Sequence, residues 1–386
     1  MTKKKIEQPS FKDLIPVSSP SVGEEELNEV AKVFRSKWLG MGSWVAKFEE
    51  ELRSFINAKN AIAVNTGTTA LHLALDAIGV KRGDEVIVPS LTFVASVQAI
   101  VATGAQPVFC DVEEETLNMD VDDVARRITR RTRAIMPVHY SGLPCDMERI
   151  IRLAKKHNIR VVEDAAHAFG SSYNGKRIGS FGDITCFSFD PIKNITCGEG
   201  GAIVTHDHDL ARLIYKKRIL GIDKDTWSRY RHARDWFYSV STSGFRYHMS
   251  NINAAIGLVQ IGKFDRFITR KKEIVKRYDR AFGNIDGIEL LKRDYSNTAP
   301  FNYIIKVKKG RNEFMTFLKK NNIDSGVHYI PNHIQPYFAD RRTKLPVTER
   351  VWNEILTLPL YPDMPDEKVV FIIRKVKEYW GGNAKG

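Results

Sequence analysis

The stretch 186-CFSFDPIKNITCGEGGAIVTHD-207 carries one lysine, Lys193, between a strand-like aromatic run and three closely spaced glycines, Gly198, Gly200 and Gly201. Such glycines permit a tight turn and a close backbone approach to a ligand. Lysine and arginine together number 59 in the chain, so Lys193 taken alone is an ordinary surface lysine. An amine on a structured turn can also be partly desolvated, which lowers its pKa and suits it to Schiff-base formation. This stretch alone does not distinguish an ordinary surface lysine from a Schiff-base lysine.

The length and composition are those of an ordinary globular protein. The chain has 386 residues, of which 43% are hydrophobic and 27% are charged. This length predicts one large domain and a smaller one. The start, 1-MTKKKIEQPS-10, is basic without an apolar stretch behind it, and no run of about 18 apolar residues occurs in the sequence. We therefore expect a soluble, cytoplasmic protein without a membrane partner.

The cysteines and the net charge argue against several classes of function. The four cysteines form no CxxC pair and no zinc-type grouping with histidine, so we expect neither a disulfide framework nor a bound metal. The net charge of +13 attracts phosphates, either on nucleic acid or on small metabolites. Because no zinc-finger, bZIP or RRM signature accompanies this charge, we do not expect a nucleic-acid partner.

Helix-like and strand-like patterns alternate from about residue 24 to 205. Helical spacing of apolar residues predicts helices over 24–38, 44–56, 68–78, 94–103 and 147–157. Short apolar runs predict strands over 60–64, 85–89, 107–110, 134–138 and 159–163. This alternation indicates a largely parallel sheet covered on both faces. Beyond residue 250, a long helix over 252–282 precedes a smaller α+β segment with a strand over 301–307 and helices near 311–321 and 366–380.

Ligands bind at the carboxyl ends of parallel strands, so the residues after each run are the candidate site. In 65-NTGTT-69, free backbone N–H groups at a helix start suit a phosphate, but Thr66 or Thr68 can also simply cap the helix. Asp164 follows the last of these strands and is either a catalytic acid or a structural cap. His167 is either a satisfied core histidine or a site residue.

These signals gain meaning in combination. A phosphate cradle, an acid at a strand end and a later lysine in a glycine-rich turn are the parts that pyridoxal phosphate requires. The cradle would anchor the cofactor phosphate, Asp164 would keep the pyridine nitrogen protonated, and Lys193 would form the Schiff base. The sequence therefore predicts a pyridoxal-phosphate enzyme.

The chain resembles the DegT/DnrJ/EryC1/StrS family of pyridoxal-phosphate-dependent sugar aminotransferases over roughly residues 14–380. The motifs that carry the resemblance are 65-NTGTTALHLAL-75, 83-GDEVIVPSLTFVASVQAI-100, 104-GAQPVFCDV-112, 161-VVEDAAHAFGSSYNG-175, 187-FSFDPIKNITCGEGGAIVT-205, 244-GFRYHMSNINAAIGL-258 and 357-TLPLYPDM-364. The resemblance implies an α/β fold of type I, like aspartate aminotransferase, with a mostly parallel seven-stranded sheet and a smaller C-terminal α+β domain. It divides the chain into an N-terminal segment (1–23), a large cofactor-binding domain (24–264) and a small domain (265–386).

The resemblance also implies roles for individual residues. Lys193 would form the Schiff base and shuttle a proton between cofactor and substrate. Asp164 would pair with the pyridinium nitrogen, His167 would lie near the ring's phenolic oxygen, and Phe93 would stack on the ring. The other implied contacts are Thr68, Thr69 and Ser188 to the phosphate, Arg246 to a phosphate or sugar nucleotide where many relatives have asparagine, and His328 and Tyr329 to the substrate. For His328 and Tyr329, a packed structural loop is the alternative.

The implied reaction moves an amino group from an amino acid, L-glutamate by resemblance, to a nucleotide-linked keto sugar, with pyridoxamine phosphate as the intermediate form of the cofactor. It serves the biosynthesis of amino sugars and of glycans such as lipopolysaccharide O-antigen. A homodimer with shared active sites is implied, because the segment equivalent to 221–248 reaches the neighbouring subunit in relatives. The basic residues that could neutralise the nucleotide diphosphate, or that are instead plain solvated charges, are Lys216, Lys217, Arg218, Arg229 and Arg231.

Two other functions remain possible at this stage. Some relatives are nucleotide-sugar dehydratases that use pyridoxamine phosphate and have histidine in place of the lysine, so Lys193 argues against that activity. A non-enzymatic regulatory or nucleic-acid-binding protein would need no lysine in a glycine turn.

Overall fold

The computed structural model describes residues 11–223, 238–339 and 343–383. Its largest sheet has seven strands in the order β1-β9-β8-β5-β4-β2-β3. The strand bounds are β1 (Asn60–Val64), β2 (Glu85–Pro89), β3 (Gln106–Cys110), β4 (Thr132–Ile135), β5 (Arg160–Asp164), β8 (Ile184–Ser188) and β9 (Gly201–Thr205). β9 runs antiparallel to both β1 and β8, and the other neighbouring strands pair in parallel. The prediction of a mostly parallel seven-stranded sheet is confirmed.

Helices cover both faces of this sheet, as the continuous apolar runs in its strands require. On β1, Ile62 and Val64 face one core cluster while Ala61 and Ala63 face another, because successive side chains point to opposite faces. The first face is covered by α3 (Gly67–Ala77), α4 (Val94–Ala102) and α7 (His208–Lys217). The opposite face is covered by α2 (Ser43–Ile56), α5 (Val121–Arg127), α6 (Met147–His157) and part of α9 (Asn251–Phe282).

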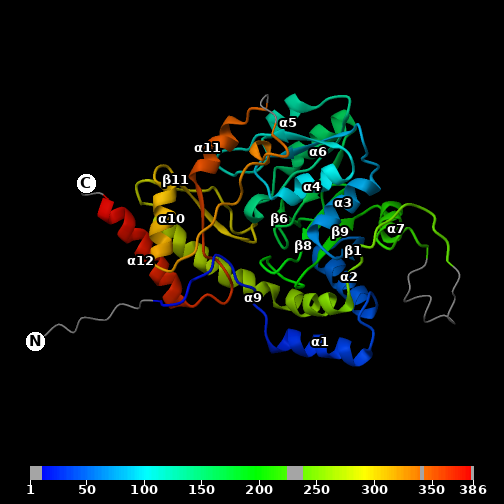
Figure 1. The fold of residues 1–386 in the computed structure, drawn as a ribbon, viewed down its shortest axis with the longest axis horizontal. Coiled ribbons are helices and arrows are strands. Elements are labelled where there is room, and N and C mark those ends of the chain that lie inside the picture. The colour runs from blue at the N-terminus through cyan, green and yellow to red at the C-terminus, as the bar shows by residue number, and fades with distance from the viewer. Residues whose placement is uncertain (1–10, 224–237, 340–342, 384–386) are drawn as a thin grey trace, which may run out of the picture.

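A smaller antiparallel sheet lies toward the C-terminus, in the order β10-β11-β12. The remaining bounds are α1 (Glu24–Ser36), β6 (Ser172–Tyr173), β7 (Lys176–Arg177), β10 (Ile288–Leu290), β11 (Tyr303–Val307), α10 (Arg311–Lys320), α11 (Pro346–Glu354), β12 (Ile355–Leu358) and α12 (Asp366–Asn383). Figure 1 shows α9 running from beneath the large sheet toward this smaller unit. Its early residues pack in the core of the large sheet and its later ones, such as Tyr278, in the core of the small sheet. α9 therefore passes without a break through residues 264 and 265, between which the sequence analysis divides the domains. No helix among the described residues has the length and apolarity to cross a membrane.

β9 is a strand that the sequence pattern did not predict, and it positions the lysine turn. Ser188 ends β8 directly opposite Gly201, the first residue of β9, so the chain reverses at the carboxyl edge of the sheet. A Cβ atom on Gly201 would lie 2.3 Å from the carbonyl oxygen of Thr66 and 2.9 Å from the amide nitrogen of Gly67. The glycines were expected to allow a close approach to a ligand, whereas Gly201 closely approaches the chain's own β1–α3 loop.

The substitution Gly201→Ala is expected to lower the free energy of unfolding by about 1–3 kcal/mol, because the new methyl group meets backbone that cannot retreat. Gly262 provides a matched control, because it lies inside α9 with nothing within 4 Å of a built Cβ atom. Gly262→Ala is expected to raise the same free energy by about 0.5–1 kcal/mol. Urea denaturation of both variants measures the difference, and equal stabilities would contradict the close packing assigned to Gly201.

Candidate active site

A cavity of about 360 Å³ lies at the carboxyl edge of the large sheet. It is lined by residues that follow β1, β2, β5 and β8, together with residues from the loop between α10 and α11. Eight of the predicted site residues line it, namely Thr68, Phe93, Asp164, His167, Ser188, Lys193, His328 and Tyr329. Thr69 and Arg246 do not line it. Sequence segments more than 250 residues apart thus meet in one place.

Lys193 lies in the turn between β8 and β9, where its N–H donates to the carbonyl oxygen of Asp190 at 3.1 Å. Its Nζ lies 4.5 Å from the ring centroid of Phe301. Burial lowers the pKa of Lys193 to about 8, although the carboxylates of Asp190 and Asp164 oppose this shift. The amine therefore exchanges protons readily near neutral pH, which suits both nucleophilic attack and proton transfer.

Asp164 is the last residue of β5, and its carboxylate is held from two sides. Ser96 Oγ donates to Oδ2 at 2.6 Å, and the amide of Ala166 donates to Oδ1 at 3.1 Å. The hydroxyls of Thr92 and Ser96 lie 2.9 Å apart and extend this chain of hydrogen bonds. Burial raises the pKa of Asp164, with the bonds from Ser96 and Ala166 opposing the shift. Ser96 was not among the predicted site residues, because its only signal in the sequence is its position on the helix after a strand end.

His167 is buried and its ring is fixed by aromatic neighbours. It stacks on Phe301 with ring centroids 4.2 Å apart and an interplanar angle of 8°. Its Nε2 lies 2.9 Å from the hydroxyl of Tyr329. Burial lowers the pKa of His167 well below its usual value, so the ring is neutral at pH 7. Its Nδ1 is buried without a hydrogen-bond partner among the residues that the structure describes, unlike that of a satisfied core histidine.

In the β1–α3 loop, one residue caps the following helix and others line the cavity. Thr66 caps α3, because its Oγ1 accepts from the amide of Thr69 at 3.1 Å. The Thr69 hydroxyl donates to Asn65 Oδ1 at 2.7 Å, and Thr69 does not line the cavity. Thr68 and Gly67 line the cavity beside Ser188, and a Cβ atom on Gly67 would lie 2.7 Å from that of Ser188. The helix start thus presents backbone N–H groups to the cavity, which suits an anion.

Of the other predicted contacts, His328 and Phe93 line the cavity and Arg246 does not. His328 Nδ1 lies 2.8 Å from Thr357 Oγ1, and burial lowers its pKa to about 4. Phe93 is 54% exposed, and its ring centroid lies 5.5 Å from that of Tyr329. Arg246 is exposed, and its backbone pairs with Ile219 outside the cavity. Of the segment 221–248, residues 224–237 lie outside the described part of the chain.

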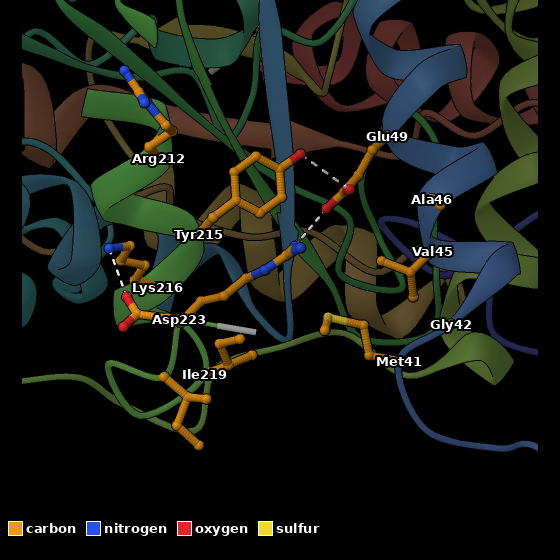
Figure 2. A pocket seen from close by; sticks show the side chains of 12 residues that line it. Met41, Gly42, Val45, Ala46, Glu49, Arg212, Tyr215, Lys216, Ile219 and Asp223 are labelled. Atoms are coloured by element: carbon orange, nitrogen blue, oxygen red, sulfur yellow. Dashed lines mark hydrogen bonds and ion pairs between the residues drawn. The ribbon is translucent and has the colours of Figure 1, made fainter. Parts of the chain in front are cut away.

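The basic residues expected to neutralise a nucleotide diphosphate do not line this cavity. Lys216 and Arg218 line a separate cavity of about 430 Å³ between α2 and α7 (Figure 2). Their partners, and that of Lys217, are carboxylates: Lys216 pairs with Asp223 at 2.7 Å, Lys217 with Asp76 at 2.7 Å, and Arg218 with Glu49. Figure 2 also shows the Tyr215 hydroxyl directed at Glu49. Carboxylates of the same chain thus neutralise Lys216, Lys217 and Arg218. The other two candidates, Arg229 and Arg231, lie outside the described residues.

Comparisons with known proteins agree with this geometry. The sequence matches the DegT/DnrJ/EryC1/StrS aminotransferase family over residues 20–377. It is 41% identical over 375 residues to the spore coat polysaccharide biosynthesis protein SpsC of Bacillus subtilis (strain 168), covering 94% of this chain and 96% of that protein. It is 38% identical over 370 residues to the GDP-perosamine synthase of Escherichia coli O157:H7, covering 95% and 98%. The PMP form of Spr1654 from Streptococcus pneumoniae superposes with a TM-score of 0.89 at 31% identity, covering 94% of this chain and 98% of that one. Spr1654 is also solved in a PLP form.

The raised pKa of Asp164 has a consequence for stability. A carboxyl group whose pKa is raised by folding binds its proton more tightly in the folded state, so its ionisation destabilises the fold at pH values above the raised pKa. Asp164→Asn removes this charge while keeping an acceptor for Ala166. The ligand-free variant is therefore expected to have a higher free energy of unfolding than the parent at pH 7.

Urea denaturation between pH 7 and pH 4 checks this expectation, and the difference should shrink as the pH falls toward 3.8, the ordinary pKa of aspartate. Asp286→Asn is the control, because Asp286 is exposed and its replacement should change stability by less than about 0.5 kcal/mol. A less stable Asp164→Asn protein at pH 7 would contradict the burial cost assigned to this carboxylate.

Proposed function

The chain belongs to the DegT/DnrJ/EryC1/StrS aminotransferase family, and on that premise we propose that it transfers an amino group from L-glutamate to a nucleotide-linked keto sugar. It is a pyridoxal-phosphate-dependent aminotransferase that acts on sugars. The observation that carries the proposal is the meeting of a lysine amine, a carboxylate and a helix start in one cavity. The net charge of +13 favours a substrate with a diphosphate, and one relative is named for a GDP sugar.

The cavity residues fit pyridoxal phosphate in three respects. The unpaired Nδ1 of His167 leaves a buried polar atom that a ring oxygen can satisfy. The start of α3, with Thr68 beside Ser188, suits the phosphate. Burial disfavours the charged form of Asp164, and a protonated ring nitrogen would supply the positive charge that stabilises it.

The proposed chemistry divides between the cofactor and the chain. When bound, pyridoxal phosphate supplies a ring that withdraws electrons from the substrate carbon that loses its proton. Lys193 Nζ would take up that proton and return it, which a pKa of about 8 permits near neutral pH. Asp164 would hold a proton on the ring nitrogen, with its own orientation fixed by Ser96 Oγ at 2.6 Å. His167, held by Tyr329, would bond the ring oxygen, and Phe93 would cover one ring face.

The substrate side of the cavity is assigned to His328 and Tyr329. A pKa of about 4 keeps His328 neutral at pH 7, so it would act as a hydrogen-bond partner to a sugar hydroxyl and not as a cation. Lys193 supports amino transfer over dehydration, because the dehydratase relatives considered above have histidine at this position.

A screen of substrates tests the proposal directly. The purified enzyme is incubated with ¹⁵N-labelled L-glutamate and a panel of NDP-3-keto and NDP-4-keto sugars, and the products are analysed by mass spectrometry. We expect labelled nitrogen in at least one nucleotide-linked amino sugar, and fragmentation locates it at C3 or C4. Lys193→Ala protein is the control and should give no product. Transfer only to unlinked sugars, or only from another donor, would contradict the proposed substrates.

We also propose that the active protein is a homodimer in which Arg246 of one subunit completes the site of the other. Arg246 is exposed and lies outside its own subunit's cavity, which supports a contribution across an interface. Symmetric dimers with such shared sites can be tested by complementation between inactive variants.

Lys193→Ala and Arg246→Ala chains are each expected to be nearly inactive alone. After the two chains are mixed under exchange conditions, about half of the dimers should be mixed, and each should contain one intact site. The regained amination activity should then be about a quarter of the parent's. A mixture of Lys193→Ala with Asp164→Asn is the control, because both residues belong to the same subunit's cavity and no site is restored. A mixture with no regained activity would contradict the shared site.

A further inference from the structure

Lys271 is a buried lysine in the middle of α9, with only 3% of its surface exposed. Among the described residues no carboxylate lies within ion-pair distance of its Nζ, whereas the other two buried lysines, Lys217 and Lys306, are paired with Asp76 and Glu289. Burial lowers the pKa of Lys271 to about 7. A buried amine without a counterion is costly, so its position requires an explanation other than a salt bridge.

The hydrogen bonds of Lys271 both go to neutral oxygen atoms beside the active site. Its Nζ donates to Asn194 Oδ1 at 3.0 Å and to the carbonyl oxygen of Phe301 at 2.9 Å. Asn194 directly follows Lys193 in the chain and is itself 5% exposed. The side-chain nitrogen Nδ2 of Asn194 donates to the carbonyl oxygens of Phe169 and Ala299, each at 3.3 Å. With the bond from Lys271, both polar atoms of the Asn194 side chain have hydrogen-bond partners.

Phe301 connects Lys271 to the amine from the other side. The Phe301 ring stacks on His167 at 4.2 Å, and Lys193 Nζ lies 4.5 Å from its centroid. The Lys271 amine thus bonds two residues next to Lys193. One is Phe301, whose backbone carbonyl accepts and whose ring contacts Lys193, and the other is Asn194, whose side chain accepts.

We propose that Lys271 is a positioning residue that fixes the turn carrying Lys193, and thereby keeps the Lys193 amine in its desolvated place against Phe301. This inference rests on the proposed function for the role given to Lys193. The geometry it describes is a property of the chain alone, so it can be tested without cofactor or substrate.

The environment of Lys193 determines the expected response. The carboxylates of Asp190 and Asp164 raise its pKa, while burial lowers it. The imidazoles of His167 and His328 also face it, and both are neutral at pH 7 because burial lowers their pKa values. If the turn loosens, water reaches the amine while the carboxylates remain, so the pKa of Lys193 should rise toward the ordinary value of 10.5.

The test measures the pH dependence of reductive methylation at Lys193 in cofactor-free protein, followed by peptide mass spectrometry. The parent should show a midpoint near pH 8. Lys271→Met removes both hydrogen bonds of the amine and keeps a side chain of similar volume. It should raise this midpoint by about one pH unit or more. Asn194→Ala should also raise the midpoint, and the double variant should shift it by less than the sum of the two single changes, because the two side chains share one hydrogen bond.

Lys306→Met is the matched control, because Lys306 is 1% exposed but lies in β11, paired with Glu289. Its loss should lower stability without moving the Lys193 midpoint. If Lys271→Met protein does not fold, the methylation midpoint of Asn194→Ala protein alone tests the proposal. A midpoint unchanged in the variants that fold would overturn the positioning role. Because the assay contains no cofactor or sugar, failure of the sugar-amination screen would leave this result untouched, and the reverse also holds.

Discussion

The antiparallel pairing of Ser188 with Gly201 is the constraint on which the rest of the site depends. It forces the chain to reverse at the carboxyl edge of the sheet and carries Lys193 in that reversal. Asp164 ends the strand next to β8, opposite Cys186, so the carboxylate reaches the same edge as the amine. The close approach of Gly201 to the β1–α3 loop brings the start of α3 beside them. Backbone pairing thus places Lys193, Asp164 and the start of α3 at one edge of the sheet.

Burial pushes three titratable groups of the cavity, Asp164, Lys193 and His167, toward their neutral forms. The pKa of Asp164 is raised, while those of Lys193 and His167 are lowered, and burial is the largest cause in each case. Such shifts mean that the charged forms of these groups are disfavoured in the ligand-free protein. The groups stay buried because the sheet that positions them is covered on both faces. A ligand with a phosphate, a basic ring nitrogen and a ring oxygen would find partners at Thr68, Asp164 and His167. The same low-dielectric setting strengthens interactions with charge that develops during the reaction.

The sequence predicted those parts of the site that follow from strand ends. Asp164 and Lys193 could be assigned because parallel strands share one carboxyl edge and the glycine turn marked the lysine. Contacts that depend on side-chain packing could not be predicted. The Thr69 hydroxyl is taken by Asn65, and Ser96 reaches Asp164 from a neighbouring helix. Likewise, the contact of Lys271 with Asn194 joins residues far apart in the chain, with no pattern in either segment to reveal it. The ion pairs of Lys217 and Arg218 were not predictable for the same reason, because their carboxylate partners, Asp76 and Glu49, lie on other elements.

The central claim is that Lys193 is the residue that binds the cofactor covalently. Borohydride reduction of the enzyme loaded with pyridoxal phosphate, followed by peptide mapping, tests it most directly. The account predicts that the reduced cofactor is attached to the peptide 186-CFSFDPIKNITCGEGG-201 at Lys193, and that Lys193→Ala protein is neither labelled there nor active. Labelling at another lysine, or sugar amination that persists at the parent rate in Lys193→Ala protein, would contradict it.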